Sequence, residues 1–549
     1  MVVKHSDGTR PIDLASYYLT ARLGIGQALT IGSIHRRLSL YPVNEVLECL
    51  AEICIRADHL PIRQPDKNIA FARWLFPRQS LRRAELALTD PHASPMSSQV
   101  AVNLALHALV ACAPTGRPPD KPDLIRTLGG LCLALGDHLG RDRNDDDLSM
   151  TVEITRLGLF YTQNDLSSWL DLAHELFFEV MPSMTDDHDF VDCGGVVSDA
   201  YGINFERFWA LTVVEGIAVS EAPGAIPLPQ RVEGWNVTEE ELAAWTTAWS
   251  SSIDDARAAS RRDIDRATGW SFEAFADRPL IQLGGGDKLV AVRPAWIPSK
   301  ATPAGMFWAV RHPFVAAGGS HSTWSQFMGR AVEELGRRLV ARYLPHIKVV
   351  EESEIATWGT GSNCDLMLLE TGVLAIDFVF RQFTKESSGT GNFADLAADL
   401  RKAAVQKLHQ IDKSLAKGIA GSHLPPGSLY PMVVIGGPFP VNPLLYDAVQ
   451  SAFSAEPSEV LGHDVSARPF ALIDMGSFLA LLRVAQGLQI ELSALLEGWL
   501  TSGMAKSSLR DWLTTDGPRL SDEIPELRWG SRAFALLGLP QPPLQQLGH

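Results

Sequence analysis

The chain has 549 residues, of which 46% are hydrophobic and 20% are charged, as in ordinary globular proteins. This composition excludes a disordered, fibrous or low-complexity protein. The 48 Lys and Arg residues against 64 Asp and Glu give a net charge of −16, so the overall field repels phosphate. A general nucleic-acid coat is therefore excluded, whereas a local basic site stays open.

The start of the chain, MVVKHSDGTRPIDLASYY, has no apolar core and no cleavage signal, so we do not expect secretion. No apolar run reaches the ~20 residues that cross a bilayer, so we expect no membrane contact. The cysteines form no C-x-x-C pair, which predicts reduced core residues in a cytoplasmic protein. The six cysteines are Cys49, Cys54, Cys112, Cys132, Cys193 and Cys364.

Apolar residues recur at helical spacing through residues 1–270, which predicts a mainly helical region with its own apolar core. The predicted helices cover 14–30, 43–57, 97–112, 123–138, 163–180 and 238–265. Thr238 and Glu241 form a capping box at the start of the last helix. The segment PGAIPLP, 223–229, predicts a break between two subdomains. We expect this region to recognise a partner or to regulate the rest of the chain.

The pattern changes near residue 278, where RPLIQLGGGDKLVAVRP predicts two strands around a Gly-rich turn. No helix and no Lys-Ser/Thr pair follow the glycines, which favours a hairpin over a phosphate-binding loop. The order beyond this point predicts an α/β domain over 271–490, a mixed sheet flanked by helices, and then a helical segment with a Pro-rich tail, 491–549. The predicted elements are a helix at 323–343, strands near 347–355, 364–370 and 373–382, a helix at 393–417, a strand at 430–437 and a further strand-helix unit.

The segment SNCDLMLLETGVLAIDFVFRQF, 362–383, predicts a strand, a turn and a strand. A three-residue loop, 370–372, makes Asp365 and Asp377 direct cross-strand neighbours. Like charges that face each other at ~4.5–5.5 Å destabilise a sheet, so we expect something to offset the repulsion between the two carboxylates. A divalent cation such as Mg²⁺, which takes carboxylate ligands, would do so. A two-residue loop would instead place Asp365 opposite Phe378 and weaken this argument.

Two flanking helices are compatible with such a site. In the helix 324–343, Glu333 lies slightly nearer the apolar stripe than Glu334, so Glu333 is the better candidate to reach a sheet edge. In the helix 393–417, Lys407 lies near the edge of the apolar stripe and faces the sheet. This second helix is basic, so its local field can attract phosphate although the whole chain is acidic.

The order of a helix with Glu333, a strand, the Asp365 and Asp377 strands, a basic helix and a strand resembles the core of the PD-(D/E)XK nuclease superfamily. These are restriction-endonuclease-like phosphodiesterases, and the resemblance covers residues 321–440. It implies that Asp365 and Asp377 bind Mg²⁺ or Mn²⁺ and that Glu333 assists.

The family places a Lys two residues after the second acidic residue, where it orients or activates the attacking water, and Val379 stands at that position here. Either another cation substitutes, with Lys407 as the first candidate and Arg381 as the second, or the fold has lost catalysis.

The resemblance implies a Mg²⁺-dependent nuclease that hydrolyses nucleic-acid phosphodiesters, DNA rather than RNA, in a defence or DNA-processing setting. We also expect a protein partner or an oligomer. The alternative is a catalytically degenerate nuclease fold that serves as a binding or scaffolding subunit of a larger complex.

Structural interpretations compete with these roles. Asp365 can be a solvated residue near a turn, and Asp377 can pair with Arg381 instead of a metal. A solvated helix face is the favoured interpretation of Glu333, and an interface position along apolar surface is the favoured one of Lys407. The segment TDDHDFVDC, 185–193, fits an acidic surface loop better than a cation site.

Overall fold

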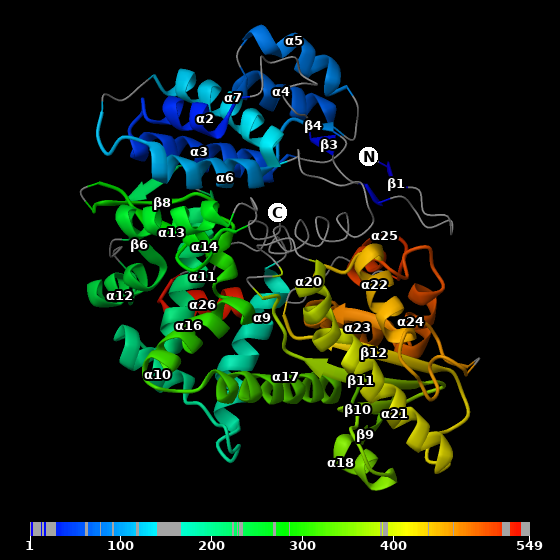
Figure 1. Cartoon of the computed structure of the whole chain (residues 1–549). Helices are drawn as coiled ribbons and strands as arrows, with labels where there is room; N and C mark the ends of the chain where they lie inside the picture. The colour runs from blue at the N-terminus through cyan, green and yellow to red at the C-terminus, as the bar shows by residue number, and fades with distance from the viewer. Residues whose placement is uncertain are drawn as a thin grey trace.

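The computed structural model shows three regions: a helical bundle, α2 to α7, a second helical region around α11, and an α/β region that holds the larger sheet (Figure 1). The residues it describes are 2–3, 12–13, 16–17, 29–60, 64–76, 78–89, 93–116, 120–139, 166–221, 224–227, 229, 234–266, 271–284, 286–384, 387, 393–437, 439–464, 466–518 and 528–539.

The first bundle places the apolar helix α6 against α3, α7 and α13. Almost every residue of α6 from Ser98 to Leu109 is buried, because apolar residues lie on all sides of this helix. The bundle consists of α2 (Ile31–Leu38), α3 (Val43–Asp58), α4 (Pro65–Leu75), α5 (Arg78–Ala87), α6 (Ser98–Ala111) and α7 (Lys121–Leu139). The predictions near α3, α6 and α7 are therefore confirmed.

The helix predicted over 14–30 lies mostly outside the described residues. Within it, Ser16–Tyr17 forms strand β3, which pairs with β4 (Ala93–Ser94), so the prediction is wrong at these two positions. A second short pair joins β1 (Val2–Val3) to β2 (Ile12–Asp13).

The second helical region is built around α11. The hydroxyl of Thr212 in α11 accepts hydrogen bonds from the indole N–H groups of Trp245 (3.2 Å) and Trp249 (3.1 Å), so buried donors are paired. The predicted capping box of Thr238 and Glu241 is present. The elements are α9 (Ser167–Glu175), η2 (Leu176–Val180), η3 (Met181–Ser183), α10 (Cys193–Tyr201), α11 (Phe205–Glu221), α12 (Glu239–Trp249), α13 (Ile253–Asp265), α14 (Glu273–Ala276), α15 (Trp296–Ser299) and α16 (Pro303–Ala316).

A four-stranded sheet crosses this part of the chain in the order β5-β8-β7-β6. The predicted hairpin is confirmed, because β7 (Leu280–Gln282) and β8 (Lys288–Ala291) are antiparallel. The predicted break at 223–229 instead contains β5 (Ala225–Pro227), which pairs with β8. The helix predicted over 238–265 is interrupted by β6 (Ser250–Ser252), which pairs with β7. Strand pairing with distant residues therefore overrides local helical spacing here.

The α/β region contains a five-stranded mixed sheet in the order β13-β12-β11-β10-β9. The pairs β9–β10 and β10–β11 are antiparallel, whereas β11–β12 and β12–β13 are parallel. The predicted mixed sheet flanked by helices is confirmed. The strands are β9 (Lys348–Glu351), β10 (Leu366–Leu369), β11 (Val373–Val379), β12 (Leu429–Ile435) and β13 (Ala471–Asp474).

Helices cover both faces of this sheet (Figure 1). On one face, α17 packs against β11 and α23 packs against β12 and β13. On the other face, α21 packs against β11 and β12. These helices are α17 (His321–Tyr343), α18 (Glu352–Ile355, after β9), α20 (Phe393–Leu400), η5 (Arg401–Val405), α21 (Gln406–Ala420), α22 (Pro443–Ser454) and α23 (Met475–Leu488).

The last elements are helical, as predicted, and the Pro-rich tail lies outside the described residues. They are α24 (Leu492–Leu500), α25 (Leu509–Thr515) and α26 (Arg528–Leu536). Helix α26 packs against α11, so the end of the described chain returns to the second helical region.

The expectation that residues 1–270 have an apolar core of their own is wrong. One buried cluster joins the first bundle to residues of α13, α14, β7 and β8. A second cluster joins residues of α9 to α12 with α17, α23 and one face of the five-stranded sheet. Helical spacing predicts which face of a helix is apolar but not which element it meets, so packing crosses the predicted boundary.

The six cysteines are free and buried, in agreement with the prediction of core residues. Burial raises the thiol pKa of Cys49 and of Cys112 to about 12, so both remain protonated near neutral pH.

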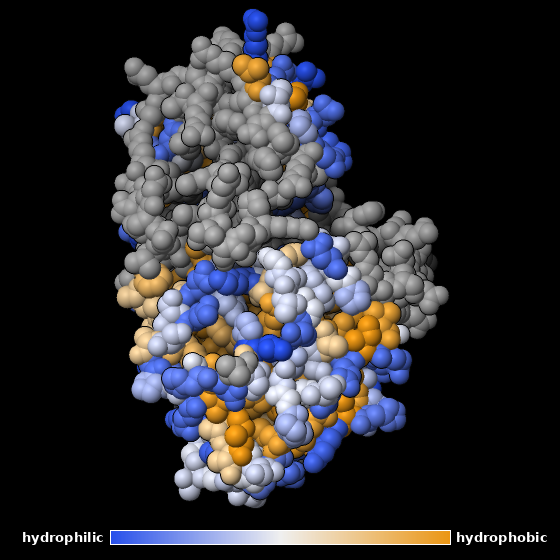
Figure 2. Space-filling view, turned by 90° about the vertical axis from the view of Figure 1, so that its right-hand side faces the viewer, coloured by the Kyte–Doolittle hydropathy of each residue, from blue (hydrophilic) through white to orange (hydrophobic). Residues whose placement is uncertain are grey.

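Among the described helices, none is by itself long and apolar enough to cross a membrane. Two consecutive helices, Met475–Leu488 and Leu492–Leu500, meet the length and composition criteria only as a pair, and they are bent by 120°. On the α/β side of the chain, hydrophilic and hydrophobic residues are interspersed over the described surface (Figure 2).

Candidate active site

The hairpin β10–β11 has the predicted register. Leu366 pairs with Ile376, and the strands are joined by the loop 370–372. The backbone N–H of Asp365 donates to the carbonyl of Ile376 at 3.1 Å, which is one residue out of this register, and Asp365 itself forms a bend just before β10. The carboxyl groups of Asp365 and Asp377 nevertheless lie within hydrogen-bonding reach of each other.

Both aspartates project from the face of the sheet that α21 covers. Side chains alternate along a strand, so Asp377 shares a face with Ala375, and the carboxyl group of Asp365 lies beside that of Asp377. Met367 and Ala375 pack in the cluster that contains the apolar side of α21. Asp365 is 5% exposed and Asp377 is 0% exposed. The hairpin therefore buries two carboxyl groups side by side.

The two carboxyl groups have different partners. Oδ2 of Asp365 accepts a hydrogen bond from the backbone N–H of Phe378 at 2.6 Å. The carboxyl group of Asp377 has the carboxyl group of Asp365 and the ammonium of Lys407 as neighbours. The ammonium Nζ of Lys407 lies 2.7 Å from Oδ1 of Asp377, and we treat this contact as an ion pair. Asp377 thus keeps acceptor capacity in a buried position.

The charges of this group act on one another. Burial raises the pKa of Asp377, and the negative charge of Asp365 raises it further. Burial also raises the pKa of Asp365, against the opposing effect of Lys407. Burial alone would lower the pKa of Lys407, but the neighbouring carboxylates outweigh it and raise that pKa. The charged ammonium form of Lys407 is therefore favoured beside the two aspartates.

Glu333 reaches the same charges from α17, on the opposite face of the sheet. Its pKa is raised to about 7, first by burial and then by the charge of Asp365, while Lys407 and Arg337 oppose the shift. Glu334 instead accepts a hydrogen bond from Arg338 at 2.8 Å. The preference for Glu333 over Glu334 thus agrees with these interactions, and both side chains are half-buried and line the same open hollow.

Sequence reasoning missed Glu352. Its backbone N–H donates to the carbonyl of Asp365 at 3.1 Å, so Glu352, Asp365 and Asp377 form a row across three strands or their extensions. The exposed Glu352 also raises the pKa of Glu333. The acidic run at 351–354 was a visible signal, but the pairing of β9 with β10 was needed to select one residue from it.

An open hollow of about 410 Å³ lies beside Glu333. Residues of α17, the segment 183–184 and Glu352 surround it, so the second helical region supplies part of its wall. Its lining consists of Ser183, Met184, Arg330, Glu333, Glu334, Arg337, Arg338 and Glu352. Three of these side chains are arginines, although the chain as a whole is acidic.

Arg381, the second candidate for the missing cation, lies elsewhere. Its guanidinium donates to Asp399 at 3.1 Å, and Asp399 also accepts hydrogen bonds from Thr384 and Ser387. Strand β11 ends at Val379, so the chain leaves the sheet before Arg381. Asp377 pairs with Lys407, and the alternative pairing of Asp377 with Arg381 is wrong.

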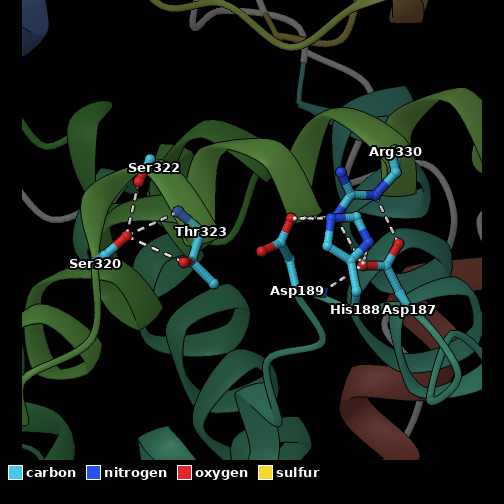
Figure 3. A network of polar contacts seen from close by, with 7 residues as sticks. All are labelled: Asp187, His188, Asp189, Ser320, Ser322, Thr323 and Arg330. Atoms are coloured by element: carbon cyan, nitrogen blue, oxygen red, sulfur yellow. Dashed lines mark hydrogen bonds and ion pairs between the residues drawn. The ribbon is translucent and has the colours of Figure 1, made fainter.

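The acidic segment 185–193 is an anchor for α17. Arg330 donates to Asp187 through Nε (2.6 Å) and Nη2 (2.7 Å), and to Asp189 at 2.7 Å (Figure 3). The hydrogen bond from Arg330 is the main reason that the pKa of Asp187 is lowered. Asp187, His188 and Asp189 also bring three ligand atoms within 4.8 Å of one another. Because Arg330 binds both carboxylates, the ion pair accounts for the position of Asp187 and Asp189.

Comparisons with protein-family models, with curated proteins and with solved structures find no match to this chain.

Whether the side chains near Asp377 can bind a metal ion is therefore argued from their chemistry alone. Carboxylate oxygens are the ligands that Mg²⁺ prefers, and the carboxyl group of Asp377 is buried beside the carboxyl group of Asp365 and the ammonium of Lys407. The pKa values of Asp365, Asp377 and Glu333 are raised in part because these carboxyl groups repel one another, although Lys407 and Arg337 oppose the shift, so a further cation would stabilise their ionised forms.

Proposed function

We propose that the chain is a Mg²⁺-dependent phosphodiesterase that hydrolyses nucleic acid, DNA rather than RNA, through a restriction-endonuclease-like core at 321–440. The observation that carries this proposal is the buried cross-strand pair of Asp365 and Asp377 with the ammonium of Lys407 2.7 Å from Asp377. The order of α17, β9, β10, β11, the basic helix α21 and β12 is also the order on which the resemblance to this class of nuclease rests.

In this mechanism Asp365 and Asp377 hold the metal, and Glu333 assists. When bound, Mg²⁺ lowers the pKa of water and stabilises charge on the phosphate. The hydrogen bond from Phe378 keeps the carboxyl group of Asp365 oriented. Glu333, whose pKa is about 7, can accept a proton near neutral pH.

Lys407 takes the place of the Lys that this family carries two residues after the second acidic residue. Val379 lies on the same face of β11 as Asp377, since the two positions differ by two residues. A Lys at 379 and a Lys on the facing helix α21 can therefore both bring an ammonium to this face, and Lys407 does so. Its role is to orient water or stabilise negative charge.

The second candidate is a catalytically degenerate platform that binds a partner. The Lys407–Asp377 ion pair favours it, because an ammonium can neutralise a carboxylate without metal. The raised pKa values of Asp365, Asp377 and Glu333 favour the enzyme, because a bound cation would stabilise their ionised forms beyond what Lys407 and Arg337 supply.

The test is cleavage of linear, supercoiled and single-stranded DNA and of RNA by the purified full chain with Mg²⁺ or Mn²⁺. We expect DNA cleavage that EDTA abolishes and that Asp365→Asn/Asp377→Asn lacks. Cleavage that persists in the double variant would contradict the proposed site. Binding of DNA or of a protein without any cleavage would favour the platform.

A further inference from the structure

The three arginines of the hollow differ in how their donors are used. Arg330 is bound to Asp187 and Asp189. Arg338 donates to Glu334 at 2.8 Å and to the hydroxyl of Ser183 at 2.6 Å. These two guanidinium groups fix the wall of the hollow and have their strongest contacts within the protein.

Arg337 is different. Its nearest carboxylate contact in the described chain is a long ion pair, 3.8 Å from Nη1 to Glu334. Its Nε is buried and has no hydrogen-bond partner among the described residues. A buried donor without an acceptor is costly, so a missing acceptor is the simplest explanation.

Arg337 also lies beside the proposed metal carboxylates. Its charge lowers the pKa of Glu333 and of Asp365, so the guanidinium lies within electrostatic reach of both. It stands one helical turn after Glu333 on α17, and both side chains line the hollow. A substrate group in the hollow can therefore meet Arg337 and Glu333, the assisting carboxyl group, together, whereas Asp365 and Asp377 are not among the lining residues.

We propose that Arg337 binds the non-bridging oxygens of the scissile phosphate and stabilises their charge in the transition state. The inference rests on the proposed function. A guanidinium presents parallel N–H donors that match two phosphate oxygens, whereas an ammonium is a point charge. In the hydrolysis, a water oxygen bonds to phosphorus, the bond from phosphorus to the leaving sugar oxygen breaks, the water gives up a proton to solvent and the leaving oxygen takes one from solvent. Arg337 transfers no proton.

The experiment compares Arg337→Gln, Arg337→Lys and the control Arg342→Gln in the full chain. Arg342 lies on the same helix, and its substitution removes the same charge but only a pair with Glu175 away from the hollow. We expect Arg337→Gln to lower kcat about 10²–10³-fold with a smaller change in KM, as for other lost transition-state donors. Arg337→Lys should recover only part of this loss, and Arg342→Gln should stay within about threefold of wild type.

A second measurement does not depend on cleavage. Fluorescence anisotropy of a labelled DNA duplex without divalent metal should show weaker binding by Arg337→Gln, with a salt slope smaller by about 1. Unchanged kcat in Arg337→Gln, or an equal loss in Arg342→Gln, would overturn the inference. If wild type cleaves nothing, the proposed function fails. The inference then fails as a catalytic role, and the anisotropy shows whether Arg337 still contacts phosphate.

Discussion

The ammonium of Lys407 lies 2.7 Å from a carboxylate oxygen of Asp377, although Asp377 is fully buried in a strand and Lys407 comes from a helix on one face of the sheet. Burying two opposite charges costs desolvation energy that the ion pair only partly returns. The pair stands next to a second buried carboxyl group, that of Asp365, which raises this cost. Such an arrangement is expected where function, rather than stability, determines the residues.

The first prediction concerns Lys407. Lys407→Met removes the ammonium but keeps most of the volume of the side chain, so DNA cleavage should fall about 10²–10⁴-fold, as strongly as in Asp377→Asn. Activity assays at matched Mg²⁺ concentration measure this. The control is Lys413→Met on the exposed side of the same helix α21, which should retain activity. Equal activity of Lys407→Met and wild type would remove Lys407 from the mechanism.

The second prediction concerns metal binding. A ligand that binds only the folded protein stabilises it, by about 2.7 kcal/mol at one hundred times its Kd. Mg²⁺ should therefore raise the Tm of wild type, and Asp377→Asn should abolish the shift. Asp189→Asn should keep the shift, because the carboxylate of Asp189 belongs to the ion pair with Arg330. A shift lost only in Asp189→Asn would move the metal to the segment 187–189.

The third prediction concerns pH. The pKa of Glu333 is about 7 in the folded chain against an ordinary 4.5, so between these values the folded state holds a proton that the unfolded state has lost. The stabilising contribution of protonated Glu333 is therefore present below pH 4.5 and is lost as the pH rises through 7. Raised pKa values of Asp365 and Asp377 act in the same direction.

Calorimetry in EDTA should accordingly show that the Tm falls as the pH rises through this window, and that Glu333→Gln reduces the fall. Glu334→Gln is the control, since Glu334 is engaged with Arg338. Mg²⁺ affinity should rise over the same window, because a ligand carboxyl group must lose its proton. An identical pH profile for Glu333→Gln and wild type would contradict the electrostatic interaction of Glu333 with Asp365.

The hairpin could be predicted from the sequence because its information is local. A three-residue loop and the alternation of side chains fix the register, and this register brings Asp365, just before β10, close to Asp377. Helical phase likewise placed Lys407 toward the sheet and selected Glu333 over Glu334. These conclusions required only the spacing of residues within single elements.

Glu352, Arg337 and the true location of Arg381 could not be predicted in the same way. Each depends on where one element ends against another: β9 against β10, α17 against the segment 183–184, and the chain beyond β11 against α20. The shared core of α11 and α17 could not be predicted either, because an apolar helix face does not indicate which element it packs against. Tertiary packing supplied this information.

The last prediction tests the packing that holds the site together. Gly336 of α17 lies against the ring of Phe378, the residue that follows Asp377 and donates to Asp365, and a Cβ at Gly336 would overlap this ring. Gly336→Ala should therefore push α17 away from β11 and destabilise the protein by about 1–3 kcal/mol. Cleavage should fall as well, since the same shift moves Glu333 relative to the aspartates.

Gly329→Ala is the matched control on the same helix. No atom lies within 4 Å of a Cβ at Gly329, so only helix propensity acts, and this change should stabilise the protein by about 0.5–1 kcal/mol. If α17 packs on β11 through Gly336, thermal unfolding should show a lower Tm for Gly336→Ala and a higher Tm for Gly329→Ala than for wild type. Equal Tm values for Gly336→Ala and Gly329→Ala would show that this contact does not set the position of Glu333, and the site would then need a different support.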